Sequence, residues 1–166
     1  MKSSQIRVLT QASVIVSMWV ASFCWAATLQ EATSAKDRGE FAVAFSQFKQ
    51  LAGSGDAAAQ FQLSLLYGSG RGTKLDAKEA LYWLRVSATH GDPQAQSNLG
   101  VAFSKGRGVA PDPIRAYAWF AAAAASGDSV ALTNRDVAAG KLSAQQLLQA
   151  KALLIQCQRT GFAPCL

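Results

Sequence analysis

Residues 55–90 read GDAAAQFQLSLLYGSGRGTKLDAKEALYWLRVSATH, and residues 91–127 read GDPQAQSNLGVAFSKGRGVAPDPIRAYAWFAAAAASG. The second segment repeats the first without a gap after 36 residues. The shared positions are Ala59/Ala95, Gln60/Gln96, Leu63/Leu99, Gly70/Gly106, Arg71/Arg107, Gly72/Gly108, Asp76/Asp112, Ala80/Ala116, Trp83/Trp119 and Ala88/Ala124. Self-similarity at a fixed period of this length is typical of a helical repeat array, a fold that often presents a binding surface.

Each repeat is predicted to fold as a helix, a glycine-rich loop and a second helix. In the first repeat, Asp56 and Asp76 stand where N-caps are expected, and Glu79 follows Asp76 at the spacing of a capping box. Gly91 is expected to end the second helix, because glycine adopts the left-handed conformation without steric cost. Apolar residues recur at helical spacing between these signals, which predicts that the two helices pack against each other.

The flanking segments predict a cap at each end of the array. Residues 27–54 carry an apolar stripe of helical period that ends at Ala52 and resembles the second half of a degenerate repeat. Residues 128–166 predict two more helices and a tail without the glycine-rich loop or the tryptophan. We therefore expect an all-α, right-handed α-solenoid of antiparallel helix pairs, with repeats at 55–90 and 91–127 between caps at 27–54 and 128–166.

Both repeats resemble the Sel-one-like repeat family, which is related to the tetratricopeptide repeats. The family pattern is A-x-x-x-L-G-x-x-Y-x-x-G-x-G, followed by D, by A-x-x-W, by A-A and by a closing G. In the first repeat it falls on Ala59, Leu63, Ser64, Tyr67, Gly70, Gly72, Asp76, Ala80, Trp83, Ala88 and Gly91. In the second it falls on Ala95, Leu99, Gly100, Phe103, Gly106, Gly108, Val109, Asp112, Ala116, Trp119, Ala123, Ala124 and Gly127. Ser64 and Phe103 depart from the pattern. The resemblance implies an α-solenoid whose concave face engages other proteins, and it implies no shared catalytic residues.

The N-terminus has the pattern of a secretory signal peptide, residues 1–26. Lys2 and Arg7 supply the positive region, a mostly apolar stretch follows, and small residues precede cleavage after Ala26 or Ala27. The alternative is an uncleaved anchor, because the apolar stretch approaches the thickness of a membrane. The expected location is the periplasm or the outside of the cell, and the membrane is a partner only if this segment is retained.

Removal of the signal peptide leaves the chain with two cysteines, Cys157 and Cys165. An even pair in an exported protein usually forms a structural disulfide. A redox-active dithiol is the alternative, but such sites favour a C-x-x-C spacing at the start of a helix. We therefore expect a bridge that holds the tail on the last helix.

Charge and motifs give no support for a catalytic, metal-binding, cofactor-binding or nucleic-acid-binding site. The net charge is +6, of which Lys2 and Arg7 contribute two, and the basic residues form no stripe with aromatic residues. The lone His90 has no partner nearby in sequence, and the S-x-x-K tetrad at Ser46 lacks the elements that accompany it in penicillin-recognising enzymes. The two Gly-Arg-Gly loops could cradle an anion on their backbone N–H groups, but a tight structural turn is the simpler interpretation.

Partner recognition would have to reside where the repeats differ. The candidate partner-binding residues on the first helix of each repeat are Phe61, Gln62, Leu65, Asn98 and Val101. Phe61 and Leu65 lie four residues apart on one helix face, so they either pack on the preceding degenerate repeat or form an apolar spot in a concave groove. In the second case they are expected to anchor a partner, with Gln62 and Asn98 as polar contacts.

These observations predict an exported, non-catalytic adaptor that binds another protein or peptide. Its expected role is in the assembly or maintenance of the cell envelope. Two other classes remain open. One is a cell-wall or β-lactam hydrolase, which lacks a visible nucleophile–base pair or metal cluster. The other is a membrane-anchored structural repeat protein that keeps its N-terminal segment.

Overall fold

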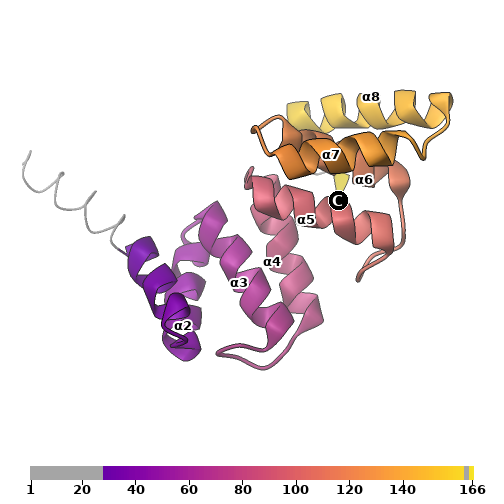
Figure 1. The fold of residues 1–166 in the computed structure, drawn as a ribbon. Helices are drawn as coiled ribbons and strands as arrows, with labels where there is room; N and C mark the ends of the chain where they lie inside the picture. The colour runs from indigo at the N-terminus through magenta and orange to yellow at the C-terminus, as the bar shows by residue number, and fades with distance from the viewer. Residues whose placement is uncertain (1–27, 163–164) are drawn as a thin grey trace, which may run out of the picture.

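The computed structural model describes residues 28–162 and 165–166, and in that part of the chain it is built from helices without a strand (Figure 1). Residues 28–37 are helical. The helices that follow are α2 (Phe41–Gly53), α3 (Ala57–Ser69), α4 (Ala77–Thr89), α5 (Pro93–Lys105), α6 (Pro113–Ala124), α7 (Ser129–Ala139) and α8 (Ala144–Thr160). The predicted signal peptide and both predicted cleavage sites lie outside the described residues.

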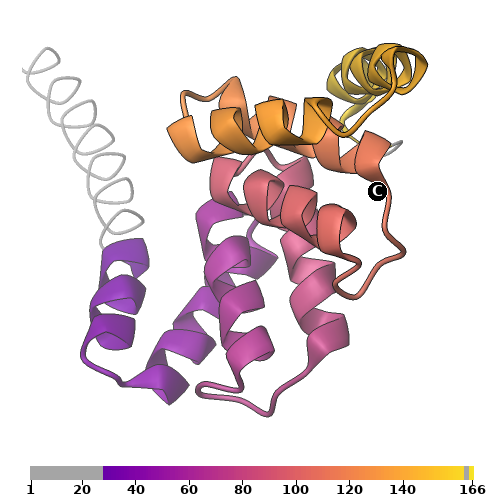
Figure 2. The same ribbon diagram turned by 45° about the vertical axis from the view of Figure 1, so that its right-hand side comes forward.

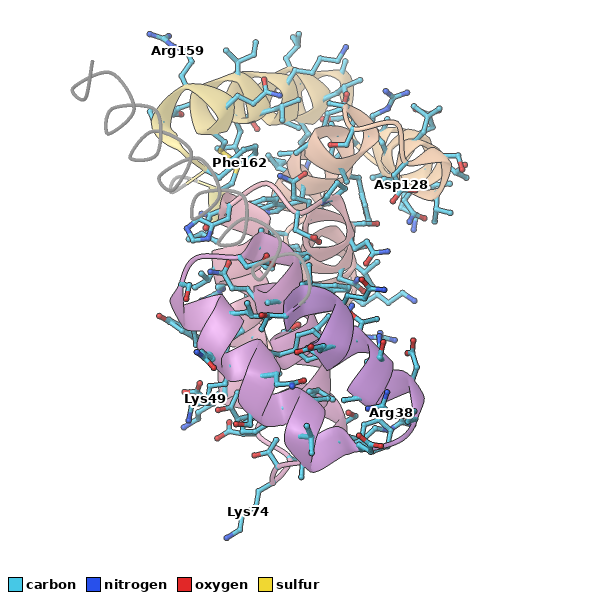
Figure 3. All side chains as sticks on the ribbon, turned by 90° about the vertical axis from the view of Figure 1, so that its left-hand side faces the viewer. Arg38, Lys49, Lys74, Asp128, Arg159 and Phe162 are labelled. Atoms are coloured by element: carbon cyan, nitrogen blue, oxygen red, sulfur yellow. A yellow bond between two sulfur atoms is a disulfide. The ribbon has the colours of Figure 1, made fainter. Side chains whose placement is uncertain are left out.

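From α2 to α7 each helix packs on the next one in the chain, which confirms the predicted all-α solenoid (Figures 1 and 2). Helices α3 and α4 pack on each other, as do α5 and α6, and α4 packs on α5. Helices α7 and α8 both pack on α6. Lys74, after α3, and Arg159, on α8, lie at opposite ends of the molecule (Figure 3). No helix in the described part of the chain is long and apolar enough to cross a membrane.

Aspartate caps set the start of each helix in the two repeats. Asp56 and Asp92 each accept a hydrogen bond of 2.7 Å from the backbone N–H three residues on. Asp76 and Asp112 cap α4 and α6 in the same way. The spacing of Asp76 and Glu79 does not give a capping box, because the Glu79 carboxylate accepts from the indole N–H of Trp83 and the Asp76 N–H donates to the Tyr67 carbonyl. A bond four residues along the same helix therefore replaces the capping box.

A buried glutamine joins each repeat to the helix before it. Gln60 donates from Nε2 to the Ala52 carbonyl at the end of α2, and Gln96 donates to the Ala88 carbonyl at the end of α4, both at 3.1 Å. The last carbonyls of a helix have no partner within the helix. Ala52 and Ala88 also accept from the backbone N–H groups of Gly55 and Gly91. Because both glutamines are buried, the bonds to these carbonyls give each side-chain amide a partner away from water.

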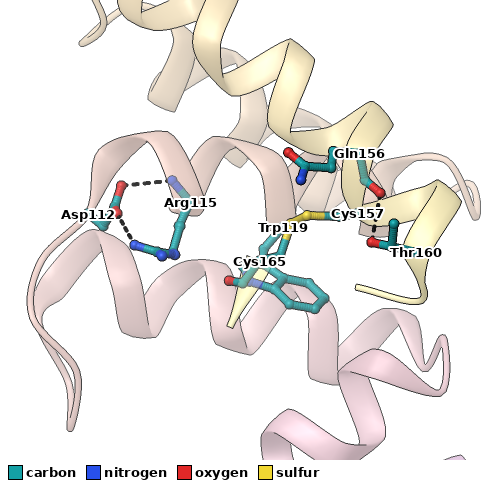
Figure 4. The surroundings of a disulfide bond; sticks show 7 residues. All are labelled: Asp112, Arg115, Trp119, Gln156, Cys157, Thr160 and Cys165. Carbon is teal, nitrogen blue, oxygen red and sulfur yellow. Dashed lines mark hydrogen bonds and ion pairs between the residues drawn. A yellow bond between two sulfur atoms is a disulfide. The ribbon is translucent and has the colours of Figure 1, made fainter. Parts of the chain in front are cut away.

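The C-terminal tail is fixed on the core by Trp119 (Figure 4). The Trp119 side chain is fully buried, its indole N–H donates to the Cys165 carbonyl at 2.9 Å, and the Phe162 ring stacks on it. Cys157 and Cys165, the pair expected to bridge, form a disulfide, and both are buried. The tail therefore closes the C-terminal end of the apolar core that α5 and α6 share with α8.

Glycines at positive φ turn the chain between the helices of a repeat. Gly72 (φ +73°) and Gly108 (φ +71°) occupy the same position in the two repeats. A Cβ on Gly72 would collide with the backbone carbonyl of Phe41, whereas a Cβ on Gly108 would lie 3.4 Å from the flexible end of Leu81. The first loop is thus pressed against the start of α2, and the second lies on a side chain that can move.

We expect Gly72→Ala to destabilise the fold more than Gly108→Ala. Both substitutions cost about 1–2 kcal/mol for placing a Cβ in the left-handed region, and only Gly72→Ala adds a clash with backbone. Urea unfolding followed by circular dichroism gives the two free energies of unfolding. Equal losses would show that the contact between the Gly72 loop and α2 is not tight in solution.

Candidate functional site

The larger of two adjoining hollows, which we call the central groove, has a volume of about 580 Å³ and is formed by α3, α4 and α5. Its lining residues are Ser64, Leu65, Gly68, Ser69, Ala77, Ala80, Leu81, Leu84, Asn98, Val101, Ala102, Arg107 and Gly108. Small residues leave space in the groove. Gly68 and Ala80 both line it, and a Cβ added to Gly68 would lie 3.6 Å from the Cβ of Ala80. The floor and walls are mostly apolar, and the polar atoms come from two serines, Asn98 and Arg107.

A second hollow, the N-terminal groove, has a volume of about 460 Å³ and lies between the start of the described chain, α3 and the loop after it. It is lined by Lys36, Asp37, Gly39, Phe41, Gln62, Leu65, Leu66, Ser69 and Arg71. Leu65 and Ser69 line both grooves. The two grooves are therefore neighbours on one surface and share a wall on α3.

The two grooves are built by equivalent parts of successive repeats. Gln62, Leu65, Leu66 and Arg71 in the N-terminal groove correspond, 36 residues on, to lining residues of the central groove. These counterparts are Asn98, Val101, Ala102 and Arg107. The frame of the site thus recurs with the repeat, while the side chains presented to a ligand differ in size and polarity from one groove to the next.

Four of the five candidate partner-binding residues line these grooves. Leu65 is 47% exposed on the shared wall. Asn98 and Val101 line the central groove, and Gln62 lines the N-terminal groove, where its side-chain carbonyl accepts from Lys36 Nζ at 3.1 Å. The structure brings these residues to one surface, and their contact with a partner stays a prediction.

Phe61 does not lie on this surface. It is 6% exposed and belongs to the core cluster that contains Ala88, Ala95 and Leu99. The two alanines leave room for its ring between the repeats. Phe61 is therefore not a surface anchor. Its cluster joins its own repeat, through Ala88, to the repeat that follows, and it is separate from the cluster that contains the preceding degenerate repeat.

Sequence reasoning missed Leu81 and the groove role of Leu84 and Arg107. Leu84 matched the repeated apolar stripe of its helix, so it was assigned to packing, and Arg107 was assigned to a turn. Leu81 carried one usable signal, because its counterpart in the second repeat is Tyr117. A position that differs between otherwise matching repeats is a candidate for recognition.

The charges at the grooves are mainly basic. The Arg71 guanidinium lies 5.1 Å from the centre of the Phe41 ring, a cation–π distance, and Arg107 is exposed. Within the described part of the chain, neither arginine is ion-paired with a carboxylate. Lys36 and Asp37 pair weakly at 3.9 Å. An arriving ligand would therefore meet two guanidinium groups without a counter-charge.

The other residues with candidate chemistry have structural surroundings. His90 Nδ1 lies 2.8 Å from the side-chain oxygen of Gln60, and Lys49 lies over the Phe45 ring. Burial raises the pKa of Asp92, and backbone N–H groups that donate to its carboxylate oppose the shift. A raised carboxyl pKa can mark a catalytic acid, but this carboxylate caps α5. The described residues hold no group of three or more metal-ligating side chains.

Comparisons with known proteins give matches of two kinds. The family model for the Sel1 repeat matches residues 57–92 and 93–128. A solved structure of a protective antigen from uropathogenic Escherichia coli strains, which displays an SLR fold, is 31% identical with a TM-score of 0.73 over 84% of this chain. This chain spans 32% of that protein. A Sel1 repeat protein from Oxalobacter formigenes is 32% identical with a TM-score of 0.50, over 66% of this chain and 95% of that one. No curated protein matches.

We expect Phe61→Ala and Leu65→Ala to differ sharply in stability. Removing the buried ring is expected to cost about 3–5 kcal/mol, whereas truncating the exposed leucine is expected to change the free energy of unfolding by about 0.5 kcal/mol or less. Urea denaturation of both variants measures this difference. A small loss in the free energy of unfolding for Phe61→Ala would show that the Phe61 ring is not buried in the core.

Proposed function

We propose that this chain, which belongs to the Sel1 repeat family, is a non-catalytic adaptor, because Sel1 repeat proteins generally bind other proteins. It binds a protein or peptide along the central groove and the N-terminal groove. The observation that carries this proposal is the recurrence of one groove in two successive repeats, with Leu65 shared between them. An elongated apolar surface that continues from repeat to repeat suits a polypeptide segment better than a compact small molecule.

The residues that would decide partner choice are Gln62, Leu65, Asn98 and Val101, together with Leu81. Leu65 has the central place, because a segment that follows both grooves must pass over it. Few interface residues supply most of the binding energy, and these are typically apolar or aromatic groups near the centre of the contact. Gln62 and Asn98 then supply polar contacts at equivalent places in the two grooves.

We further propose that the protein is exported and works in the periplasm or outside the cell, in assembly or maintenance of the cell envelope. Two observations support this location. The chain begins with the residue pattern of a signal peptide, and the disulfide between Cys157 and Cys165 suits an oxidising compartment. The division into repeats at 55–90 and 91–127 between caps at 27–54 and 128–166 is part of the same proposal.

Partner capture with a groove variant tests the adaptor function. We expect Leu65→Asn to lower the recovery of cross-linked partner proteins from an envelope extract of the source organism by about fivefold or more, the effect of losing roughly 1 kcal/mol of contact energy. The matched control is Leu148→Asn, because Leu148 is an exposed leucine on α8, away from the grooves. Quantitative mass spectrometry reports the recovery. Equal recovery by both variants, or no specific protein captured by the wild type, would contradict the proposal.

N-terminal sequencing of the protein isolated from its native compartment tests the location. The mature chain is expected to begin at Ala27 or Thr28, after removal of the signal peptide. A chain that retains Met1 and sediments with membranes would favour the membrane-anchored alternative. A chain that retains Met1 and stays in the cytosol would contradict export altogether.

A further inference from the structure

We propose that the partner segment is acidic: an extended polypeptide stretch in which apolar side chains alternate with aspartate or glutamate, whose carboxylates bind Arg71 and Arg107. This inference rests on the proposed adaptor function and specifies the chemistry of its partner. It is carried by the charge balance of the grooves, by the fixed presentation of the two arginines and by the apolar lining between them.

Most acidic residues of the chain already have hydrogen-bond or ion-pair partners outside the two groove arginines. Of its ten Asp and Glu residues, five cap helices by accepting from backbone N–H groups: Asp56, Asp76, Asp92, Asp112 and Asp128. The positive end of a helix dipole partly offsets a carboxylate at that place. Asp37, Glu40 and Asp136 pair with neighbouring basic residues, and Glu79 accepts from Trp83. Few carboxylates are left to neutralise the groove arginines.

Each groove carries an arginine that lacks an acidic partner. Arg107 is the one charged residue in the lining of the central groove. The N-terminal groove is lined by Arg71, Lys36 and Asp37, and the last two pair with each other. A ligand that follows both grooves therefore meets one uncompensated guanidinium in each. Arginine binds carboxylates through paired N–H donors, which makes this contact stronger and more directional than a neutral hydrogen bond.

The loops hold the two arginines in equivalent positions. The Arg71 N–H donates to the Leu66 carbonyl at 3.1 Å, and the Arg107 N–H donates to the Ala102 carbonyl at 2.9 Å. These backbone groups close the helix ends, so they are not free to cradle an anion. Recognition is left to the guanidinium groups, which project from a fixed backbone one repeat apart. The Gly-Arg-Gly motif thus serves the turn through its glycines and the ligand through its arginine.

The lining between the arginines selects a polypeptide over a nucleic acid. The central groove presents Leu65, Leu81, Leu84 and Val101 and no aromatic side chain. Phe41 is the one aromatic residue in the lining of the N-terminal groove, and the Arg71 guanidinium lies over its ring. Binding of single-stranded nucleic acid relies on aromatic platforms for base stacking and on a longer basic track. An extended peptide places successive side chains on opposite sides. Every second side chain can therefore face the apolar floor of the groove, while the carboxylates between them reach the arginines at its rim.

Selection from a displayed library of random peptides tests this inference with the full-length, disulfide-bonded protein. Peptides selected on the wild type are expected to be enriched in Asp and Glu together with Leu, Ile and Val. Selected peptides, measured by fluorescence anisotropy, are expected to bind Arg107→Gln about tenfold more weakly, the loss typical of a charge-assisted contact. Arg71→Gln is expected to weaken them further in combination, and added salt to weaken binding to the wild type.

The matched control is Arg159→Gln, which removes the same charge from α8, where no groove residue lies (Figure 3). It is expected to bind the selected peptides as the wild type does. Because Arg71 also contacts Phe41, the single Arg107→Gln variant keeps the proposal testable if the double variant folds poorly. Circular dichroism of each variant establishes that the fold is retained.

Three results would overturn the proposal. The first is a set of selected peptides without acidic enrichment, or no selected peptide at all. The second is equal binding by Arg107→Gln and Arg159→Gln. The third is a single-stranded oligonucleotide that binds the wild type in an Arg107-dependent way and displaces the peptides. In each case the adaptor function is judged separately: partner capture lost in Leu65→Asn but unchanged in Arg107→Gln would keep the adaptor and reject the acidic partner.

Discussion

The hydrogen bond from each buried glutamine to the end of the preceding helix sets how the repeats sit on one another. Gln60 reaches the Ala52 carbonyl and Gln96 reaches the Ala88 carbonyl with the same geometry. A buried side-chain amide left without this bond costs about 1–3 kcal/mol, so each junction admits few alternative arrangements. The alanines at these junctions allow the neighbouring helices to approach closely. Together with the glutamine bonds, this close packing sets the position of α3 relative to α5. The width of the central groove therefore depends on contacts that lie outside it.

The same construction separates the frame of the molecule from its binding surface. Caps, turns and junction glutamines recur at the repeat period, and they fix where the grooves lie. Residues that line the grooves at equivalent positions differ: Leu65 is replaced by Val101, and Gln62 by Asn98. Arg71 and Arg107 combine both roles, because their backbone groups close the helices while their guanidinium groups stay available. Specificity can thus change along the array without disturbing the packing that supports it.

The candidate site was partly predictable from the sequence. Comparison of the repeats identified Gln62, Leu65, Asn98 and Val101, because residues that do not pack in the core can differ between repeats without destabilising the fold. It failed for Phe61, whose difference from Ser97 reflects packing: the ring fills space beside Ala88 and Ala95, which are distant in the chain. It also failed to assign Arg107 to the groove, because periodicity records that a residue recurs and does not record the direction of its side chain.

The helices, their aspartate caps, the glycine turns and the repeat family could all be predicted from the amino-acid sequence, because they depend on interactions between residues close together in the chain. The tertiary structure decided which residues that are distant in the chain contact one another. Phe61 lies in the core, and the Cys165 carbonyl accepts from the Trp119 indole N–H across 46 residues of chain. It also decided that two grooves meet at Leu65. Such outcomes depend on competition among contacts that are remote in sequence, and local pattern does not rank those contacts.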